Sequence, residues 1–196
     1  MNIFLKAKHW QLFLLNFGIP FFLYIAISIV MIGDILGHDN AGPDMVFSYM
    51  PIFFVLGFFA NLIQYGWTWS VAIKMNRIIP EEFKLNTMAF KIFFWLPLIY
   101  FPIFAIFFIL MFRSIDSITM SFLLLIPVHL FMVFCAFYCI YFTARVVKTA
   151  EYKRYTTVSD YIAEFIMIWF FPIGIWFIQP KINKMYEEYQ DQLQGT

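Results

Sequence analysis

The stretch IFFWLPLIYFPIFAIFFILMF, residues 92–112, contains no charge, no amide and no hydroxyl apart from that of Tyr100. A run of about 18 or more apolar residues is long enough to cross a bilayer as a helix. Three more runs, at about residues 11–33, 46–73 and 118–143, meet the same criterion. The chain is 63% hydrophobic and 13% charged, with a mean hydropathy of +0.78. The sequence therefore predicts an all-α integral membrane protein with four spans.

A fifth apolar segment, residues 161–178, is at the lower limit of length for a span. Asp160 or Thr157 suits the start of a helix there, and 18 residues extend for about 27 Å as a helix. Pro172 and Gly174 lie in the middle of the segment, and an internal proline removes a backbone hydrogen bond. We expect this segment either to span with a kink or to turn back as a re-entrant element.

The whole chain, residues 1–196, is predicted to form a single membrane domain that ends in a polar tail, residues 180–196. Lysine and arginine are concentrated in alternate connecting segments. Ten of them lie before the first run and after the second and fourth runs: Lys6, Lys8, Lys74, Arg77, Lys84, Lys91, Arg145, Lys148, Lys153 and Arg154. The other two connections hold only Arg113. This asymmetry predicts a cytoplasmic amino terminus.

The second run carries the clearest polar pattern. Gly57, Asn61, Gln64 and Thr68 follow a helical spacing that places all four on one face within an arc of about 60°. Two interpretations fit this stripe. It is either a contact face, where Gly57 permits close approach and the amides bond across the bundle, or the wall of a polar pocket or pore.

Three more polar side chains lie within the apolar runs: Asn16, His129 and Glu164. Such residues are expected to face another helix or a wet cavity. His129 fits either a neutral imidazole bonded to a neighbour or a proton relay. Glu164, one turn into the fifth segment, fits either a shallow interfacial position or a functional site, and Arg145 or Lys148 is its expected partner. Because Glu164, Pro172 and Gly174 share one segment, we expect that segment to be a docking or gating element.

The string WFFPIGIWFIQPKIN, residues 169–183, resembles a carboxy-terminal signature of small uncharacterised bacterial inner-membrane proteins. The resemblance covers less than a tenth of the chain. It implies a bacterial plasma membrane and implies no activity.

Signatures of catalysis do not occur in the sequence: there is no HExxH, no GxSxG and no glycine-rich phosphate loop. We expect no cofactor and no metal, and a net charge of +1 gives no indication of nucleic-acid binding. The predicted function is a non-catalytic accessory or assembly subunit, whose partners are the lipid bilayer and other membrane-protein subunits or further copies of itself. The alternatives are a small transporter or channel component that uses the polar face of the second span, and a membrane-embedded enzyme.

Overall fold

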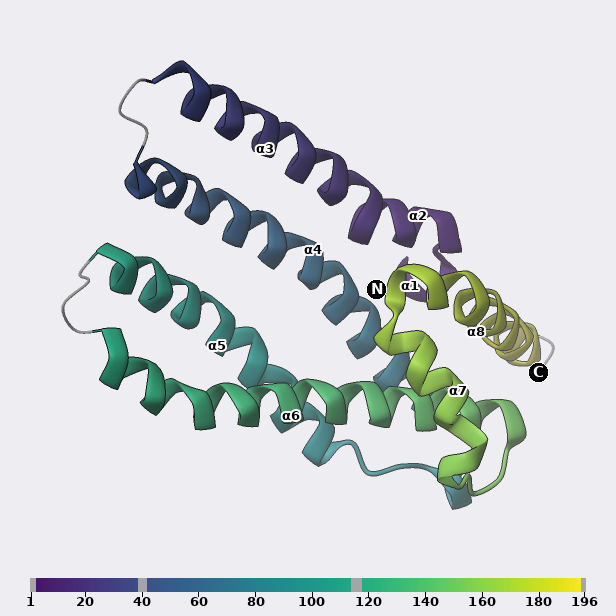
Figure 1. Ribbon diagram of the computed structural model, residues 1–196. Helices are drawn as coiled ribbons and strands as arrows, with labels where there is room; N and C mark the ends of the chain where they lie inside the picture. Colours follow the sequence, from purple (N-terminus) through teal and green to yellow (C-terminus); the bar gives the residue numbers. More distant parts are fainter. Residues whose placement is uncertain (1–2, 39–41, 114–117, 195–196) are drawn as a thin grey trace.

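Two helical hairpins form most of this protein (Figure 1). The computed structural model describes residues 3–38, 42–113 and 118–194. The hairpins are made of α3 (Ile19–Gly37) with α4 (Pro43–Ile78) and of α5 (Met88–Arg113) with α6 (Ile118–Tyr152). All regular elements of the described ranges are helical, so the predicted all-α architecture is confirmed.

Short helical pieces precede and separate the long helices. These are α1 (Ile3–Lys6), α2 (His9–Phe13), a π-helical turn (Leu14–Gly18) and a 3₁₀ turn (Glu81–Phe83). Four helical stretches of the described chain are long and apolar enough to cross a membrane: His9–Gly37, Asp44–Ile78, Met88–Leu110 and Leu125–Tyr152. Each overlaps one of the four predicted runs, and the fourth continues past residue 143 to Tyr152.

The core of the protein lies at one end of the hairpins, which we call the basal end. There α1, α7 (Val158–Trp169) and α8 (Phe171–Gln194) pack against the ends of α4 and α6. The buried apolar side chains of this core include Trp67, Val71, Met75, Phe90, Phe142, Val146, Ile168, Ile175, Ile178 and Ile182. Because these neighbours cover them, α4 and α6 continue as helices several residues past the predicted ends of their apolar runs.

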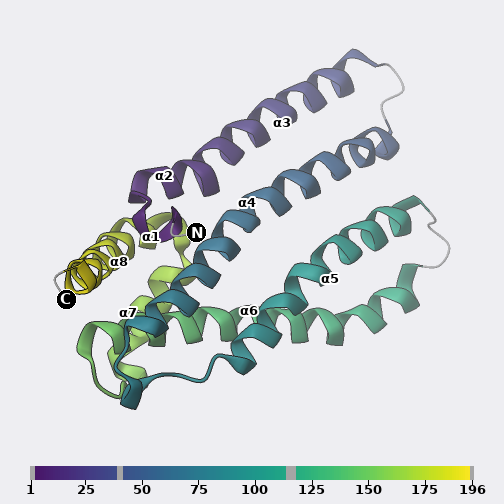
Figure 2. The same cartoon turned by 180° about the vertical axis from the view of Figure 1, so that it is seen from behind.

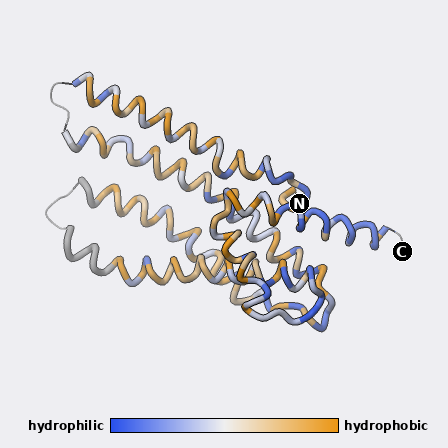
Figure 3. Tube along the Cα trace, turned by 45° about the vertical axis from the view of Figure 1, so that its right-hand side comes forward, coloured by the Kyte–Doolittle hydropathy of each residue, from blue (hydrophilic) through white to orange (hydrophobic). Residues whose placement is uncertain are grey.

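Away from the base, at the distal end, the hairpins lie clear of α7 and α8 (Figure 2) and consist mainly of hydrophobic residues (Figure 3), and many of their apolar side chains are exposed. None of the described side chains of α3 is buried, and within the described chain α3 packs mainly on α4 and the adjoining π-helical turn. Hydrophobic residues dominate both hairpins there, whereas hydrophilic residues gather at the base. Water would make such exposure unfavourable, so these surfaces indicate contact with a lipid bilayer.

The fifth apolar segment is two helices rather than one. Helix α7 ends at Trp169, Phe170 adopts φ −88° and ψ 55°, and α8 begins at Phe171 and turns back against α7. A helix of 12 residues is about 18 Å long, too short to cross a bilayer. The kinked-span alternative is therefore wrong. Pro172 lies in the first turn of α8 rather than in the middle of a helix. A backbone N–H in the first turn has no acceptor within the helix, so a proline there costs no hydrogen bond.

Gly174 makes this reversal possible. A Cβ atom at this position would lie 1.7 Å from the carbonyl oxygen of Met167 in α7. Only glycine permits an approach this close. We refer to residues 169–177, from the end of α7 through the first turns of α8, as the elbow.

The carboxy-terminal tail is also helical. Helix α8 continues through Pro180 to Gln194, although Pro180 cannot donate the hydrogen bond of a helix interior. Its buried residues recur at helical spacing, from Ile175 and Ile178 to Ile182 and Tyr186. The packing of this stripe against the base outweighs the loss of one hydrogen bond.

The reversal at the elbow places Lys181 and Lys184 at the same end of the bundle as the other basal lysines. Lys181 contacts Glu151 at the end of α6. If the fifth segment had crossed the membrane, both lysines would lie on the opposite side from most of the positive charge. The structure therefore strengthens the charge asymmetry between the two ends.

This asymmetry predicts that the base of the bundle faces the cytoplasm. Reporter fusions after Glu82 and after Gln194 are expected to give a cytoplasmic signal, and a fusion after Gly42 an external one. Paired alkaline phosphatase and green fluorescent protein fusions measure both states. An external signal after Gln194 would contradict the reversal at the elbow, and inverted signals at all three sites would contradict the orientation.

Candidate functional site

Four charged side chains form a cluster where α6, α7 and α8 meet. The Lys148 ammonium donates to Glu164 Oε1 at 2.9 Å and to Glu151 Oε2 at 3.0 Å. Lys181 donates to the same Glu164 oxygen at 3.2 Å. Glu164 is 1% exposed, so it is a buried carboxylate compensated by two cations rather than an interfacial one. Lys148 was one of its two expected partners.

The electrostatics of Glu164 follow from this arrangement. Burial alone would raise the pKa of its carboxyl group, but the hydrogen bonds from Lys148 and Lys181 hold the pKa below the ordinary value of 4.5. Its second oxygen, Oε2, is buried and has no hydrogen-bond partner within the described residues. Glu164 therefore remains ionised near neutral pH and ties α7 to both neighbouring helices.

The start of α7 is fixed locally. Thr157 is the N-cap, and its backbone N–H donates to the Asp160 carboxylate at 2.8 Å. Arg154 also donates to Asp160, at 2.9 Å. The Thr157 backbone bond and then Arg154 hold the pKa of Asp160 below its ordinary value. Of the two candidates for the cap, Thr157 is thus correct, and Asp160 completes the capping box.

A second polar centre, which the sequence analysis missed, is Gln179 of α8. Its side chain is fully buried, accepts from Trp67 Nε1 at 2.7 Å, and donates to the carbonyls of Phe4 and Ala7 at 2.8 and 2.9 Å. Asn183, one turn further on, also donates to Ala7, at 3.2 Å. Gln179 thereby joins α8 to α4 and to the amino terminus. The sequence signal for a buried Gln179 was its position between Ile178 and Pro180, at the end of an apolar run.

The polar stripe of α4 faces a cavity. Asn61, Gln64 and Thr68 line about 260 Å³ of space with Cys139 of α6 and Trp169 of the elbow. Gly57 does permit close approach, because a Cβ there would lie 3.0 Å from the Tyr24 hydroxyl of α3. Among the described residues, Gln64 alone of the stripe has a hydrogen bond across the bundle, a long one of 3.5 Å to the Ile168 carbonyl. Asn61 instead donates to the Gly57 carbonyl of its own helix. The pocket interpretation of the stripe describes this geometry better than the contact interpretation.

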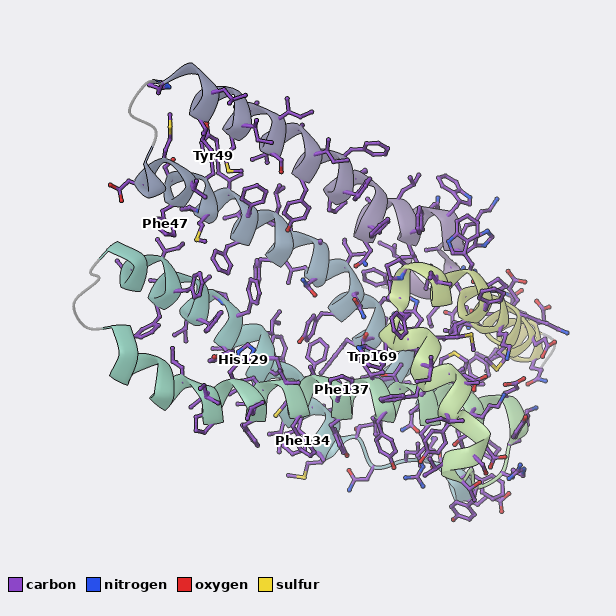
Figure 4. The ribbon with its side chains drawn as sticks, in the orientation of Figure 1. Phe47, Tyr49, His129, Phe134, Phe137 and Trp169 are labelled. Carbon is purple, nitrogen blue, oxygen red and sulfur yellow. The ribbon has the colours of Figure 1, made fainter. Side chains whose placement is uncertain are left out.

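His129 lies between α5 and α6 (Figure 4). Its Nδ1 atom is 3.3 Å from the Tyr100 hydroxyl, so the imidazole is bonded to a neighbour, as one of the two interpretations expects. Both side chains line a cavity of about 200 Å³ that also reaches Asn61. About two turns further along α6, toward the base, Phe137 meets Trp169 edge to face, with ring centroids 5.3 Å apart.

Asn16 is separate from the other candidates. It lies in the π-helical turn before α3, its side chain is half-buried, and its Oδ1 atom has no hydrogen-bond partner among the described residues. The structure thus brings Asn61, Gln64 and Thr68 together, places His129 in the adjoining cavity, and puts Glu164 in the charged cluster.

Comparisons with known proteins identified no relative of this chain. No protein-family model matches this sequence, and searches among curated proteins and solved structures found no match. Within the described ranges, no three histidine, cysteine, aspartate or glutamate side chains are grouped so as to hold a metal ion.

The charged cluster predicts a specific loss of stability. Glu164→Gln leaves two cations without their shared carboxylate, and breaking a buried pair in this way costs about 3 kcal/mol. Thermal unfolding in detergent measures the change. The matched control is Glu81→Gln, because Glu81 pairs with Lys84 on the surface and such pairs contribute about 0–1 kcal/mol. Equal Tm values for the two variants would contradict this role of Glu164.

The comparison of wild type with Glu164→Gln also gives a prediction about pH. Because folding lowers the pKa of Glu164, its contribution is complete above the ordinary carboxyl value and is lost as the pH falls through the folded pKa. The Tm difference between wild type and Glu164→Gln is therefore expected to be constant near pH 7 and to shrink below about pH 4.5. A difference that grows in acid would contradict the assigned direction.

Gln179 generates a further prediction. Gln179→Leu removes three hydrogen bonds and leaves the Trp67 N–H and the Phe4 carbonyl without partners, whereas Asn183 still donates to the Ala7 carbonyl. Each unsatisfied buried group costs about 1–3 kcal/mol, so the variant is expected to lose about 2 kcal/mol or more. Gln194→Leu, an exposed change at the end of α8, is the control. Tm measurements in detergent that show no difference between the two would contradict the joining role of Gln179.

Proposed function

We propose that this protein is a non-catalytic, multi-pass subunit of a bacterial inner membrane, with a cytoplasmic amino terminus, that assembles with other membrane proteins through its elbow. The carrying observation is the contrast between the two sides of the elbow. Its inner side is buried and flanked by Glu164 and Gln179, whose side chains are bonded to the base, and its outer side is apolar and exposed. The docking role expected of the fifth segment is thereby retained, on a different geometry from a kinked span.

The outer side of the elbow exposes several large apolar side chains. Phe170, Ile173 and Phe177 are 54%, 68% and 60% exposed. The inner side includes Phe171, Gly174 and Ile175, all buried. Glu164 fixes α7, and Gln179 fixes α8, against the base of the bundle. The exposed side chains of the elbow therefore lie on a rigid support. A rigid apolar surface loses little conformational entropy when a partner binds to it.

The polar end of α8 supports a protein partner over a lipid anchor. Helix α8 runs without interruption from the elbow into a segment that carries Lys184, Glu187, Glu188 and Asp191. In Figure 3 this hydrophilic end extends away from the hairpins. A partner with both a membrane part and a cytoplasmic part would contact the elbow and this end of α8 together. A simple lipid anchor would need only the apolar elbow and not the polar end of α8.

One observation favours a second candidate, the ligand-binding or transport function that was the first alternative. The stripe of α4 lines cavities, and these adjoin one another in the part of the bundle that the candidate spans form. Such space between helices is where membrane proteins bind small ligands.

The assembly proposal is tested by affinity purification in mild detergent with identification of the co-purifying protein. Ile173→Ala and Phe177→Ala are expected to reduce recovery of that protein, or of a second copy, at least fivefold without changing abundance. Matched controls are Ile103→Ala on α5 and Phe22→Ala on α3, whose side chains are 61% and 69% exposed. Equal recovery from all four variants, or no partner and a monomer by light scattering, would contradict the proposal.

A further inference from the structure

Three cavities follow one another along α4. The distal one, about 230 Å³, lies between α4 and α5 and is lined by apolar side chains, among them Phe54, Phe58 and Phe101. The middle one shares Phe58 and Phe101 with it and adds α6. The basal one shares Asn61 and Tyr65 with the middle one and reaches Trp169. Neighbouring cavities share lining side chains, so the three lie in series along α4, and we refer to them together as the groove.

The length of the groove matches a lipid-soluble molecule. Its lining on α4 runs from Pro51 to Thr68, which is about 26 Å along a helix. The hydrocarbon core of a bilayer is about 30 Å thick. A single extended chain that lies beside α4 would therefore cross most of the membrane within the protein.

The polarity of the groove changes from one end to the other. The distal cavity is lined by Phe, Pro, Val, Ile and Ala side chains only. The basal cavity has the amides of Asn61 and Gln64 and the hydroxyl of Thr68. An amphiphile would therefore lie with its headgroup at the base and its tail toward the distal end.

The lining also restricts the charge of the headgroup. None of the described residues that line the three cavities is a lysine, arginine, aspartate or glutamate. A phosphate or carboxylate there would be buried without a counter-charge, which is strongly unfavourable. The lysines of the base, Lys153, Lys181 and Lys184, line a different cavity. The headgroup is therefore uncharged.

Hydrogen-bond donors are prominent around the headgroup position. The indole of Trp169 is a donor only, and Gln64 and Tyr65 also carry N–H or O–H groups. The contact of the Gln64 amide with the Ile168 carbonyl is 3.5 Å long, so little is lost when the amide turns toward a ligand. Tyr65 and Trp169 offer ring faces and edges as well, which suit a planar ring. A quinone ring combines these properties: it is planar and uncharged, and its carbonyls only accept.

We propose that the groove of α4 binds a prenyl quinone, with the quinone ring between Gln64, Tyr65 and Trp169 and the prenyl tail along Phe58 and Phe101. The proposal concerns binding of the oxidised ring and includes no electron transfer. It stands independently of the assembly proposal, because the groove and the outer side of the elbow are lined by different side chains apart from Trp169.

The test is a titration of the purified full chain in nanodiscs with menaquinone-4, followed by quenching of tryptophan fluorescence. Wild type is expected to show saturable quenching. Gln64→Leu and Asn61→Leu are expected to raise Kd about tenfold, the effect of one hydrogen bond of about 1.4 kcal/mol. Asn61 is exposed, so that variant keeps its fold, which circular dichroism verifies. Ser28→Ala on α3, away from the groove, is the control and is expected to bind as wild type does.

Competition distinguishes the quinone from other lipids. Equimolar monoolein, an uncharged acyl lipid, and equimolar lysophosphatidylglycerol, a charged one, are expected to leave the menaquinone-4 titration unchanged. Displacement by either lipid would overturn the assignment of a quinone. Quenching that does not saturate, or a Kd that is the same in wild type, Gln64→Leu and Asn61→Leu, would overturn the site itself.

Discussion

The contact between Gly174 and the Met167 carbonyl determines how the basal half of this protein is assembled. A side chain larger than hydrogen at position 174 would force α7 and α8 apart. Because they stay together, α8 runs back along the base instead of continuing away from α7. Lys181 then reaches Glu164, and Gln179 reaches Trp67 and the amino terminus. Both polar centres depend on this one reversal.

The two polar centres have different consequences for the same interface. Gln179 satisfies the Trp67 N–H and the Phe4 carbonyl, which would otherwise lack partners, and it shares the Ala7 carbonyl with Asn183. Glu164 carries a charge, and a buried charge is tolerated because two ammonium groups approach one of its oxygens. Buried polar groups of this kind specify one arrangement of α7 and α8 against the base, since any other arrangement would leave them unpaired.

The hairpins differ from the base in how tightly they are packed. At the base, Trp67, Phe90 and Phe171 are buried from all sides. Toward the distal end, α4 meets α5 and α6 less closely, and the groove lies between them. Apolar side chains gain little from burial against one another when the alternative is lipid, so nothing drives the distal parts to close. The space that a ligand would occupy therefore costs less in the membrane than it would in water.

The sequence by itself determined the helical class and the four long apolar helices, because each backbone must satisfy its own hydrogen bonds across about 20 consecutive residues in lipid. It also determined that Gly57, Asn61, Gln64 and Thr68 share a face, because helical periodicity is a local property. Only the tertiary structure decided that residues 161–178 reverse at Phe170, that Lys148 and Lys181 share Glu164, and that the stripe faces a cavity. These features depend on contacts between segments far apart in the chain, and local periodicity carries no information about such contacts. Gln179 shows the difference most clearly: its partners Phe4 and Trp67 lie more than 100 residues before it, and folding alone brings them together.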